Sequence, residues 1–569
     1  MYNSIFDVSI FISIANSIFF ILINLSLANN LDNFLSKKKI FNNFDYSFLL
    51  SFYLIFLIDC VIYNLLILIK SKIFIFYFYY ILKIICFIIF FRKISIKFQL
   101  NKINAEYKLV LLIFLIIAFL PVTDADSIAI HLNFPISYLS NLINLNEPLK
   151  YAELSLYFNS EVLLINSILF KSSNLGNLLN FVSLSIFLIS SIKNLKKNNF
   201  LLLFFSMPLI LFLLNTQKLQ LFFAILYLVI FIYFNDKSKR EINNPSILTL
   251  SFLVIFYVSG KLSYVLLSIP LVIFIIFKLR NFILFKYLFI ASFILLFPVL
   301  LNKYFLFGDP LSPFLSNFLN VDIEYKNLLN TISKQGWKAE GFNLFELFQF
   351  IIPWKISYIS TATGLGFLYI LYKNFLNKFK YYFIVSCTGI FLIYLSGQIG
   401  VRFYLESILL LFWFSKFKIN KVIQYFLKFQ LLLILIISAL FLFFSISHLS
   451  KSTENFLEKF SYTFLNAKKI NNLNIKDNIL LLDQGRDSIF YNKNIFTFRI
   501  RNNEKYLISS ILENKINYIV TDNIKKIPKC INYKYIKDIE LKNATRNFLN
   551  FKNFYKGKVL KIKESKCKY

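Results

Sequence analysis

The stretch FLLSFYLIFLIDCVIYNLLILI occupies residues 48–69, and Asp59 is its only charged residue. A helix of about 20 apolar residues is long enough to cross the ~30 Å hydrocarbon core of a lipid bilayer. The stretch therefore predicts a transmembrane helix. Residues 426–444 repeat the same pattern nearer the other end of the chain.

The remainder of the chain is built from similar segments. Hydrophobic residues make up 58% of the 569 residues, and the mean hydropathy of +0.64 exceeds that of soluble domains with a polar surface. We therefore expect a polytopic α-helical membrane protein with about 13 to 15 transmembrane helices. The predicted spans are residues 4–28, 47–69, 73–91, 108–122, 175–193, 199–214, 217–234, 246–260, 262–278, 282–302, 356–373, 379–398, 401–415 and 425–448.

The charge distribution orients these spans. A net charge of +33 would indicate nucleic-acid binding in a soluble protein, but here the lysines cluster in short loops between spans, and such loops stay in the cytoplasm. The basic loops are residues 37–39, 92–93, 193–197, 237–240, 278–280, 373–380 and 416–421. All of them fall on one side if the spans alternate. We expect a multi-pass protein of the cell inner membrane, in contact with membrane lipid and without a nucleic-acid partner.

Three long or polar segments fall on the opposite, outer side. They are the outer loops at 123–174 and 303–355 and the tail that follows residue 450. Residues 159–170, NSEVLLINSILF, are apolar enough to form a further span, which would reverse the orientation of all later spans. Because that reversal violates the charge pattern, we expect a re-entrant or surface-lying helix instead.

The tail differs in character from the spans. Residues 479–483, ILLLD, and 516–522, INYIVTD, read as short buried strands, and residues 503–515 read as an amphipathic helix between them. We therefore expect a transmembrane domain over residues 1–450. A small C-terminal extracytoplasmic α/β domain follows over residues 451–569.

Two pairs of side chains invite a structural interpretation. Cys530 and Cys567 lie in the polar tail, where they are able to form a disulfide if the tail is outside the cytoplasm. Asp59 and Lys83 lie in the middle of two spans joined by a tight turn near residue 71, so the helical hairpin brings them level. Charged side chains inside a bilayer pair with one another, which predicts a buried ion pair here.

Two carboxylates stand where the fourth span meets the first outer loop. The sequence PVTDADS at 121–127 contains Asp124 and Asp126, in a chain with 29 acidic against 62 basic residues. Such a pair is able to act as a general base, or to hold a divalent cation that neutralises a phosphate leaving group. The structural alternative is that Asp124 caps the following helix while Asp126 is solvated.

Five further polar residues lie near the same side of the membrane. His131 follows the acidic pair by about one helical turn or more, and Glu153 and Glu161 lie later in the same loop. Lys218 lies in an outer turn and Arg402 at the outer start of a span. We expect the first three to line a substrate pocket and the two cations to bind an anionic lipid phosphate. The alternatives are interface packing for the acids and snorkelling for the cations.

The string PVTDADSIAIHLNFP at 121–135 closes a span and opens an outer loop. It resembles the start of the GT-C superfamily of membrane glycosyltransferases, of the dolichyl-phosphate-mannose and aminoarabinose transferase type. The stretches KLSYVLLSIP at 261–270, FGDPLSPF at 307–314 and VRFYLESILLL at 401–411 are also similar to that family. In one respect the chain departs from the family, because three predicted spans precede the acidic motif instead of one.

The resemblance implies an integral membrane glycosyltransferase that moves a sugar from a polyprenyl-phosphate carrier to a glycolipid, polysaccharide or protein. It assigns the general base to Asp124 or Asp126 and the phosphate of the donor to Arg402 and Lys218. Transfer in a single displacement inverts the anomeric centre. No cofactor follows from this beyond the alternative of a divalent cation at the acidic pair. The rival readings are an envelope polysaccharide polymerase or ligase, and a non-enzymatic transporter of lipid-linked glycans.

Overall fold

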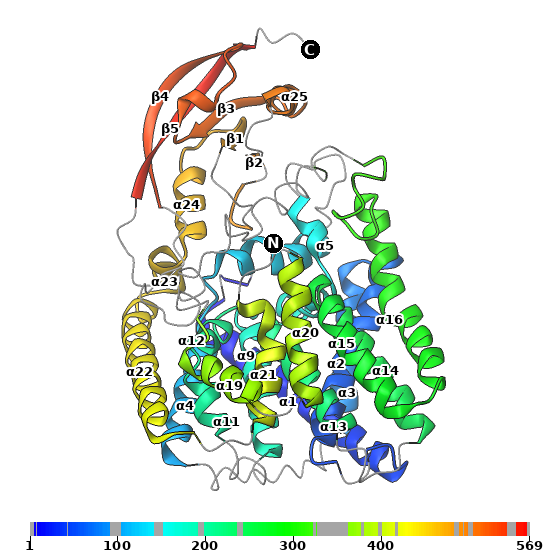
Figure 1. The fold of residues 1–569 in the computed structure, drawn as a ribbon. Coiled ribbons are helices and arrows are strands. Elements are labelled where there is room, and N and C mark those ends of the chain that lie inside the picture. The colour runs from blue at the N-terminus through cyan, green and yellow to red at the C-terminus, as the bar shows by residue number, and fades with distance from the viewer. Residues whose placement is uncertain are drawn as a thin grey trace.

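The chain folds into a large helical bundle with a small sheet-containing domain at one end (Figure 1). The structure is a computed structural model. It describes residues 5–6, 8–41, 44–90, 104–140, 152–191, 199–235, 243–321, 326, 362–376, 380–396, 401–415, 419–482, 489–492, 494–498, 504–542 and 554–565. Much of the predicted outer loop 303–355, several basic loops and Cys567 lie outside these residues.

The bundle is formed by helices that run up and down between its two ends. They are α1 (Ile10–Lys37), α2 (Ser47–Leu68), α3 (Ile73–Phe90), α4 (Ala105–Ala118), α9 (Leu175–Ser190), α11 (Phe200–Phe205), α12 (Pro208–Leu213), α13 (Gln220–Asn235), α14 (Asn244–Val258), α15 (Leu262–Leu279), α16 (Ile283–Phe307), α19 (Leu365–Leu376), α20 (Tyr381–Leu395), α21 (Leu405–Phe414) and α22 (Lys421–Leu449). Five of them, α1, α2, α15, α16 and α22, are long and apolar enough to cross a membrane. The other predicted spans form shorter helices in the described residues.

One predicted span is interrupted for a clear reason. Residues 199–214 form α11 and α12 with a break at Met207, because Pro208 lacks the N–H that a continuous helix needs and opens the second helix instead. The break is stabilised from outside, since the Gln430 side chain of α22 donates a hydrogen bond to the carbonyl of Ser206.

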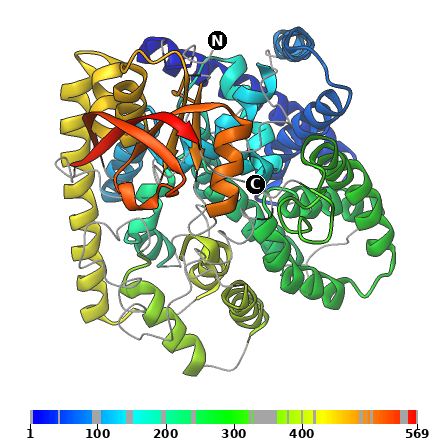
Figure 2. The ribbon, with the colours of Figure 1, turned by 90° about the horizontal axis from the view of Figure 1, so that it is seen from above.

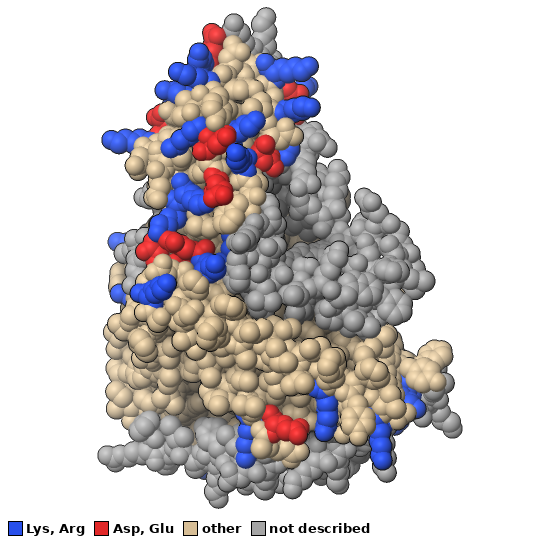
Figure 3. Space-filling model, turned by 90° about the vertical axis from the view of Figure 1, so that its left-hand side faces the viewer, with Lys and Arg blue, Asp and Glu red and all other residues tan. Residues whose placement is uncertain are grey.

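The outside of the bundle is apolar. Phe277, Phe289 and Phe443 on three different long helices are 71%, 74% and 70% exposed. Figure 3 shows, on the side of α22, a broad belt without charged side chains between the charged C-terminal domain and the charges at the opposite end. A soluble monomer rarely exposes so large an apolar surface, so the belt supports the prediction of a membrane protein.

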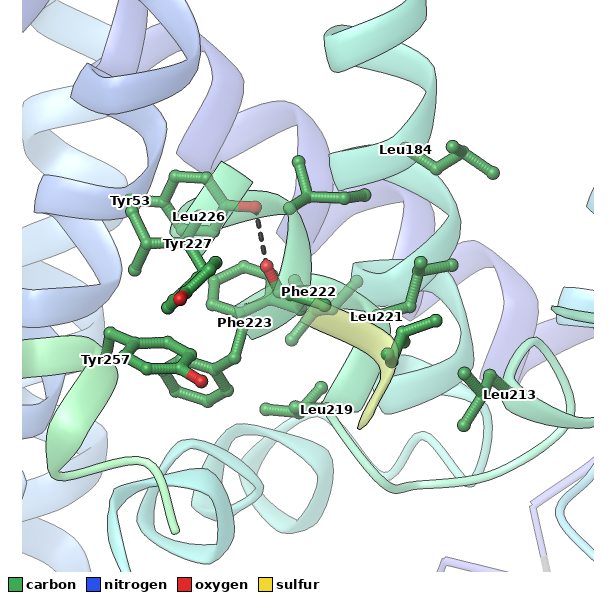
Figure 4. Close-up of a cluster of buried hydrophobic side chains, with 14 of the residues drawn as sticks. Tyr53, Leu184, Leu213, Leu219, Leu221, Phe222, Phe223, Leu226, Tyr227 and Tyr257 are labelled. Atoms are coloured by element: carbon green, nitrogen blue, oxygen red, sulfur yellow. Dashed lines mark hydrogen bonds between the residues drawn. The ribbon is translucent and has the colours of Figure 1, made fainter. Parts of the chain in front are cut away.

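The centre of the bundle is α13, whose residues are buried on all sides. Figure 4 shows its rings and leucines between side chains of neighbouring helices, with the Tyr53 hydroxyl donating a 2.7 Å hydrogen bond to the carbonyl of Phe222. Between α2 and α3, Lys83 Nζ lies 2.7 Å from Asp59 Oδ2. That contact confirms the ion pair predicted between the second and third spans.

The predicted first outer loop packs onto the end of the bundle as short helices. They are η3 (Ser127–His131), α5 (Asn133–Leu139), η4 (Ala152–Leu156), α7 (Asn159–Leu163) and α8 (Ile165–Leu169). The last two have 5 residues each, far too short to cross ~30 Å of hydrocarbon. The prediction that residues 159–170 do not form a span is therefore confirmed.

The C-terminal domain is a mixed sheet between two helices. It comprises α23 (Thr453–Phe460), α24 (Tyr462–Asn471), β1 (Asn478–Leu482), β2 (Ile495–Phe498), α25 (Glu504–Glu513), β3 (Ile516–Thr521), β4 (Ile531–Lys542) and β5 (Phe554–Ser565). The strand order is β2-β1-β3-β5-β4, parallel in its first three strands and antiparallel in the last two. One core packs Leu480 and Leu560 against α25, and the other packs Leu481 and Val559 against α24. The predicted strands at β1 and β3 and the helix between them are confirmed.

The domain stands above the end of the bundle at which α22 ends (Figures 1 and 2). The Phe490 ring, from the segment between β1 and β2, lies 5.1 Å from the ring of Phe6 before the first helix. Lys468 on α24 pairs with Glu454 on α23, which makes the connection between bundle and sheet compact. Cys530 is disulfide-bonded.

Candidate functional site

Charged side chains from three separate segments meet at the end of the bundle that faces the C-terminal domain. Lys218, in the turn between α12 and α13, places its Nζ 2.9 Å from Asp124 Oδ2 and 3.0 Å from Asp126 Oδ2. Arg402, in η7 (Val401–Tyr404), places Nη1 3.5 Å from the same oxygen of Asp126. Four of the seven residues expected from sequence to act at one site therefore lie together.

Lys218 is oriented differently from what its position in an outer turn predicts. Its side chain is 3% exposed, whereas those of Asp124 and Asp126 are each 19% exposed. The ammonium thus lies behind the two carboxylates and holds them close together. Arg402, at 22% exposed, is the more accessible of the two cations.

Asp124 is fixed by Ser127. Its Oδ2 accepts hydrogen bonds from the Ser127 N–H at 3.0 Å and from the Ser127 hydroxyl at 2.9 Å. This is the capping interaction proposed as the structural alternative, and it coexists with the Lys218 ion pair. Burial would raise the pKa of Asp124, but Lys218 and the two hydrogen bonds outweigh it and hold the pKa well below the usual range. Asp124 is therefore ionised.

The turn that carries Lys218 is tied to the acidic loop by its neighbour Gln217. The Gln217 N–H donates to the Ser127 hydroxyl at 3.0 Å, and its side-chain amide donates to the Ser173 carbonyl at 2.6 Å. Its side-chain oxygen accepts from the Gly176 N–H at 2.9 Å. A Cβ on Gly176 would lie 2.2 Å from that oxygen, so only glycine fits beside this amide.

The segment after the acidic pair is a π-helical turn, η3, in which the Leu132 N–H donates to the Ser127 carbonyl. Residues five apart diverge by about 140° around an α-helix. The wider turn brings His131 back towards the side occupied by Asp126. Such turns occur frequently at functional sites.

His131 and Glu161 form a close pair. The two are joined by a 2.5 Å contact between Nδ1 and Oε1, and their side chains are 12% and 4% exposed. Glu161 Oε2 accepts a 2.7 Å hydrogen bond from the Phe158 N–H. The short helix α7 that carries Glu161 is itself anchored, because the Asn159 N–H donates to the carbonyl of Ser259.

A third cation, Lys261, was not expected from sequence. Its Nζ lies 4.6 Å from the centre of the Phe403 ring, and the Arg402 guanidinium lies 5.0 Å from the same ring. Burial, then the positive charge of Arg402, lowers the pKa of Lys261 to about 7. Its position directly before a span, like that of Lys218, was the signal that could have identified it.

Two further glutamates border the cluster. Glu406, one turn after Arg402, is 1% exposed and interacts electrostatically with Lys261. Glu153, the remaining residue expected from sequence, is 8% exposed in η4, which packs against η3. The site thus gathers three cations with several carboxylates under the C-terminal domain.

The position between the two aspartates is taken by an ammonium group. No cluster of three or more His, Cys, Asp or Glu side chains suited to a metal ion is present in the described part of the chain. Binding of a divalent cation by Asp124 and Asp126 therefore remains a prediction, and it requires Lys218 to move away from them.

Known proteins do not identify this arrangement. No protein-family model, no curated protein and no solved structure matched the chain.

Proposed function

We propose that the chain is an integral membrane glycosyltransferase that moves a sugar from a polyprenyl-phosphate carrier to an acceptor on the outer face of the membrane. The observation that carries the proposal is the meeting of Asp124, Asp126, Lys218 and Arg402 at the end of an apolar bundle. Cations at the membrane surface would bind the phosphate of a lipid-linked sugar. Carboxylates beside them would accept a hydrogen bond from the hydroxyl group of the acceptor.

The donor phosphate is assigned to Lys261 and Arg402. Both cations contact Phe403 and are partly exposed, and their mutual repulsion falls when an anion lies between them. Arg402 offers a planar fork of donors and Lys261 a compact charge, a combination suited to phosphate oxygens. In this proposal Lys218 holds the two aspartates in place and does not contact the phosphate directly.

The acceptor is assigned to the side of Asp126. Asp124 Oδ2 already accepts from Lys218 and twice from Ser127, so Asp124 is a positioning residue in this proposal. Asp126 faces Arg402, next to the phosphate position, where its carboxylate can accept a hydrogen bond from the attacking hydroxyl. A single displacement between the two sides inverts the anomeric centre, and burial of the site limits hydrolysis by water.

The same proposal places the protein in the cell inner membrane with its C-terminal domain outside the cytoplasm. Its support is the alternation of the helices, because the described basic residues at 37–39 and 278–280 lie where α1 and α15 end, at the end of the bundle opposite that domain (Figure 1). The site then opens to the compartment where polyprenyl-phosphate sugars meet envelope acceptors.

The test is transfer of radiolabelled sugar from polyprenyl-phosphate donors to membrane acceptors at equal expression. We expect Asp126→Asn to lower the rate by about 100-fold or more, a typical loss for a group acting in the transition state. The matched control is Asp538→Asn, on the exposed face of β4. Transfer of whole oligosaccharides instead would favour the polymerase or ligase alternative. The absence of transfer from every donor would favour a transporter.

A further inference from the structure

We propose that His131 is the general base of the transfer and that Glu161 positions it. The inference rests on the proposed function and deepens it by naming the group that takes the proton. It starts from a pair that the acidic motif alone does not explain: a largely buried histidine, one turn beyond Asp126, is joined to a buried carboxylate.

The hydrogen bonds fix which nitrogen carries the proton. Glu161 Oε2 accepts from the Phe158 N–H, which fits an ionised carboxylate, and an ionised carboxylate only accepts. Its other oxygen, Oε1, therefore accepts from Nδ1–H of His131 across 2.5 Å. This leaves the imidazole Nε2 without a proton and able to accept one, with the ring held by the carboxylate behind it.

The aspartates are poorer bases than this imidazole. Asp124 contacts Lys218, and Asp126 contacts both Lys218 and Arg402. Neighbouring cations stabilise an ionised carboxylate and so weaken its ability to take a proton. A base works best when its pKa lies near the working pH, and a histidine satisfies this condition more closely than a cation-paired aspartate.

In the proposed transfer step, one proton moves, one bond forms and one bond breaks. The acceptor hydroxyl, oriented by Asp126, gives its proton to Nε2 of His131 while its oxygen forms a bond to the anomeric carbon. The bond from that carbon to the carrier phosphate breaks, and its electron pair stays on the phosphate oxygen beside Lys261 and Arg402. The imidazolium formed is stabilised by Glu161 and later releases its proton to water.

The charged groups around His131 set its pH response. Glu161 on α7 contacts it directly. Lys218 and Lys261 interact with it electrostatically from the turns that carry them. Asp126 lies at the start of η3, and Glu153 lies on η4, which packs against η3. Burial lowers the pKa of His131 below its ordinary 6.5, Glu161 opposes this, and the two lysines add to it. His131 is therefore neutral at pH 7, and activity should fall as the pH drops through its pKa.

The experiment is the pH profile of kcat/KM for sugar transfer by the full-length protein. We expect the wild type to lose activity on the acid side, and His131→Gln to be slowed by about 100-fold or more with that acid limb removed. Glu161→Gln should be slowed similarly, because its amide donates to Nδ1 and leaves the proton on Nε2. Glu161→Asp should retain more activity. The KM for the donor should stay within about twofold in all three, since the phosphate is held elsewhere.

The matched control is His448→Gln at the end of α22, which should keep both rate and profile. Binding of polyprenyl phosphate by each variant shows that it is folded. If wild type transfers sugar and His131→Gln keeps the acid limb, the role of His131 is overturned while the proposed function stands. If wild type transfers sugar from no donor, the proposed function fails and this inference fails with it.

Discussion

Lys218 determines how closely two carboxylates can lie at the site. Asp124 and Asp126 repel each other, and a single ammonium within 3.0 Å of both offsets that repulsion. Because Lys218 is 3% exposed, water screens these contacts little. The geometry of the acidic pair is therefore set from beneath, by the turn between α12 and α13.

The lowered pKa of Lys261 predicts that the protein takes up a proton when it binds phosphate. With a pKa of about 7 it is mostly neutral at pH 8 in the free protein, and a bound phosphate dianion raises that pKa by favouring the charged form. Binding of polyprenyl phosphate at pH 8 should therefore take up about one proton per site. Isothermal titration in two buffers of different ionisation enthalpy measures this uptake.

The control for that measurement is Lys261→Met, which should bind more weakly and take up no proton. Near pH 5 the wild-type lysine is already charged, so its uptake should disappear there. Equal heats in both buffers at pH 8 would contradict the assignment of phosphate to Lys261.

At the residue scale the sequence predicted the members of the site better than their roles. Asp124, Asp126, Lys218 and Arg402 meet as expected, because each is a charged residue near the same end of a predicted span. The inward orientation of Lys218 depends on the fold of a turn, which no local pattern reveals. Lys261 was missed because its neighbours read simply as the start of a span.

Packing of α9 against the turn that carries Lys218 depends on one glycine. Gly176→Ala should place a Cβ 2.2 Å from the Gln217 side-chain oxygen and displace that amide from two hydrogen bonds. Overpacking of this kind costs about 1–3 kcal/mol. We expect a lower apparent melting temperature in detergent and reduced transfer, because Lys218 loses its support.

The double variant Gly176→Ala with Gln217→Ala separates this clash from general damage. Its loss of stability should be smaller than the sum of the two single losses, because removal of the amide makes room for the new methyl group. Ser185→Ala on the same helix serves as the control. Additive losses would show that the glycine matters for another reason.

The elements differ in how well a linear pattern predicts them. Long apolar helices such as α2 and α22 follow from composition, and β1 and β3 follow from short apolar runs. Strands β4 and β5 were missed because lysines interrupt their alternation and a register shift separates Tyr535 from Lys537. Their pairing is set by contacts between distant segments of the tail.

The whole molecule is polarised along the bundle, with the site and the C-terminal domain at one end. Cysteines introduced at two exposed lysines test this orientation: Lys525→Cys in the domain and Lys39→Cys after α1. In intact cells a membrane-impermeant maleimide should label the first and should label the second only after permeabilisation. The parent protein without an added cysteine is the control, and the reverse labelling pattern would invert the proposed orientation.

The contact between Phe6 and Phe490 joins nearly the whole length of the chain. A ribosome adds about 5–20 residues per second, so roughly half a minute or more separates the synthesis of the two rings. During that interval Ile5 and Phe6, which are only 1% and 6% exposed in the finished protein, lack the C-terminal domain that helps to cover them. A stop codon just after α22 would thus yield a protein that has every helix of the bundle but leaves Ile5 and Phe6 without the contact that buries them, which should favour its degradation.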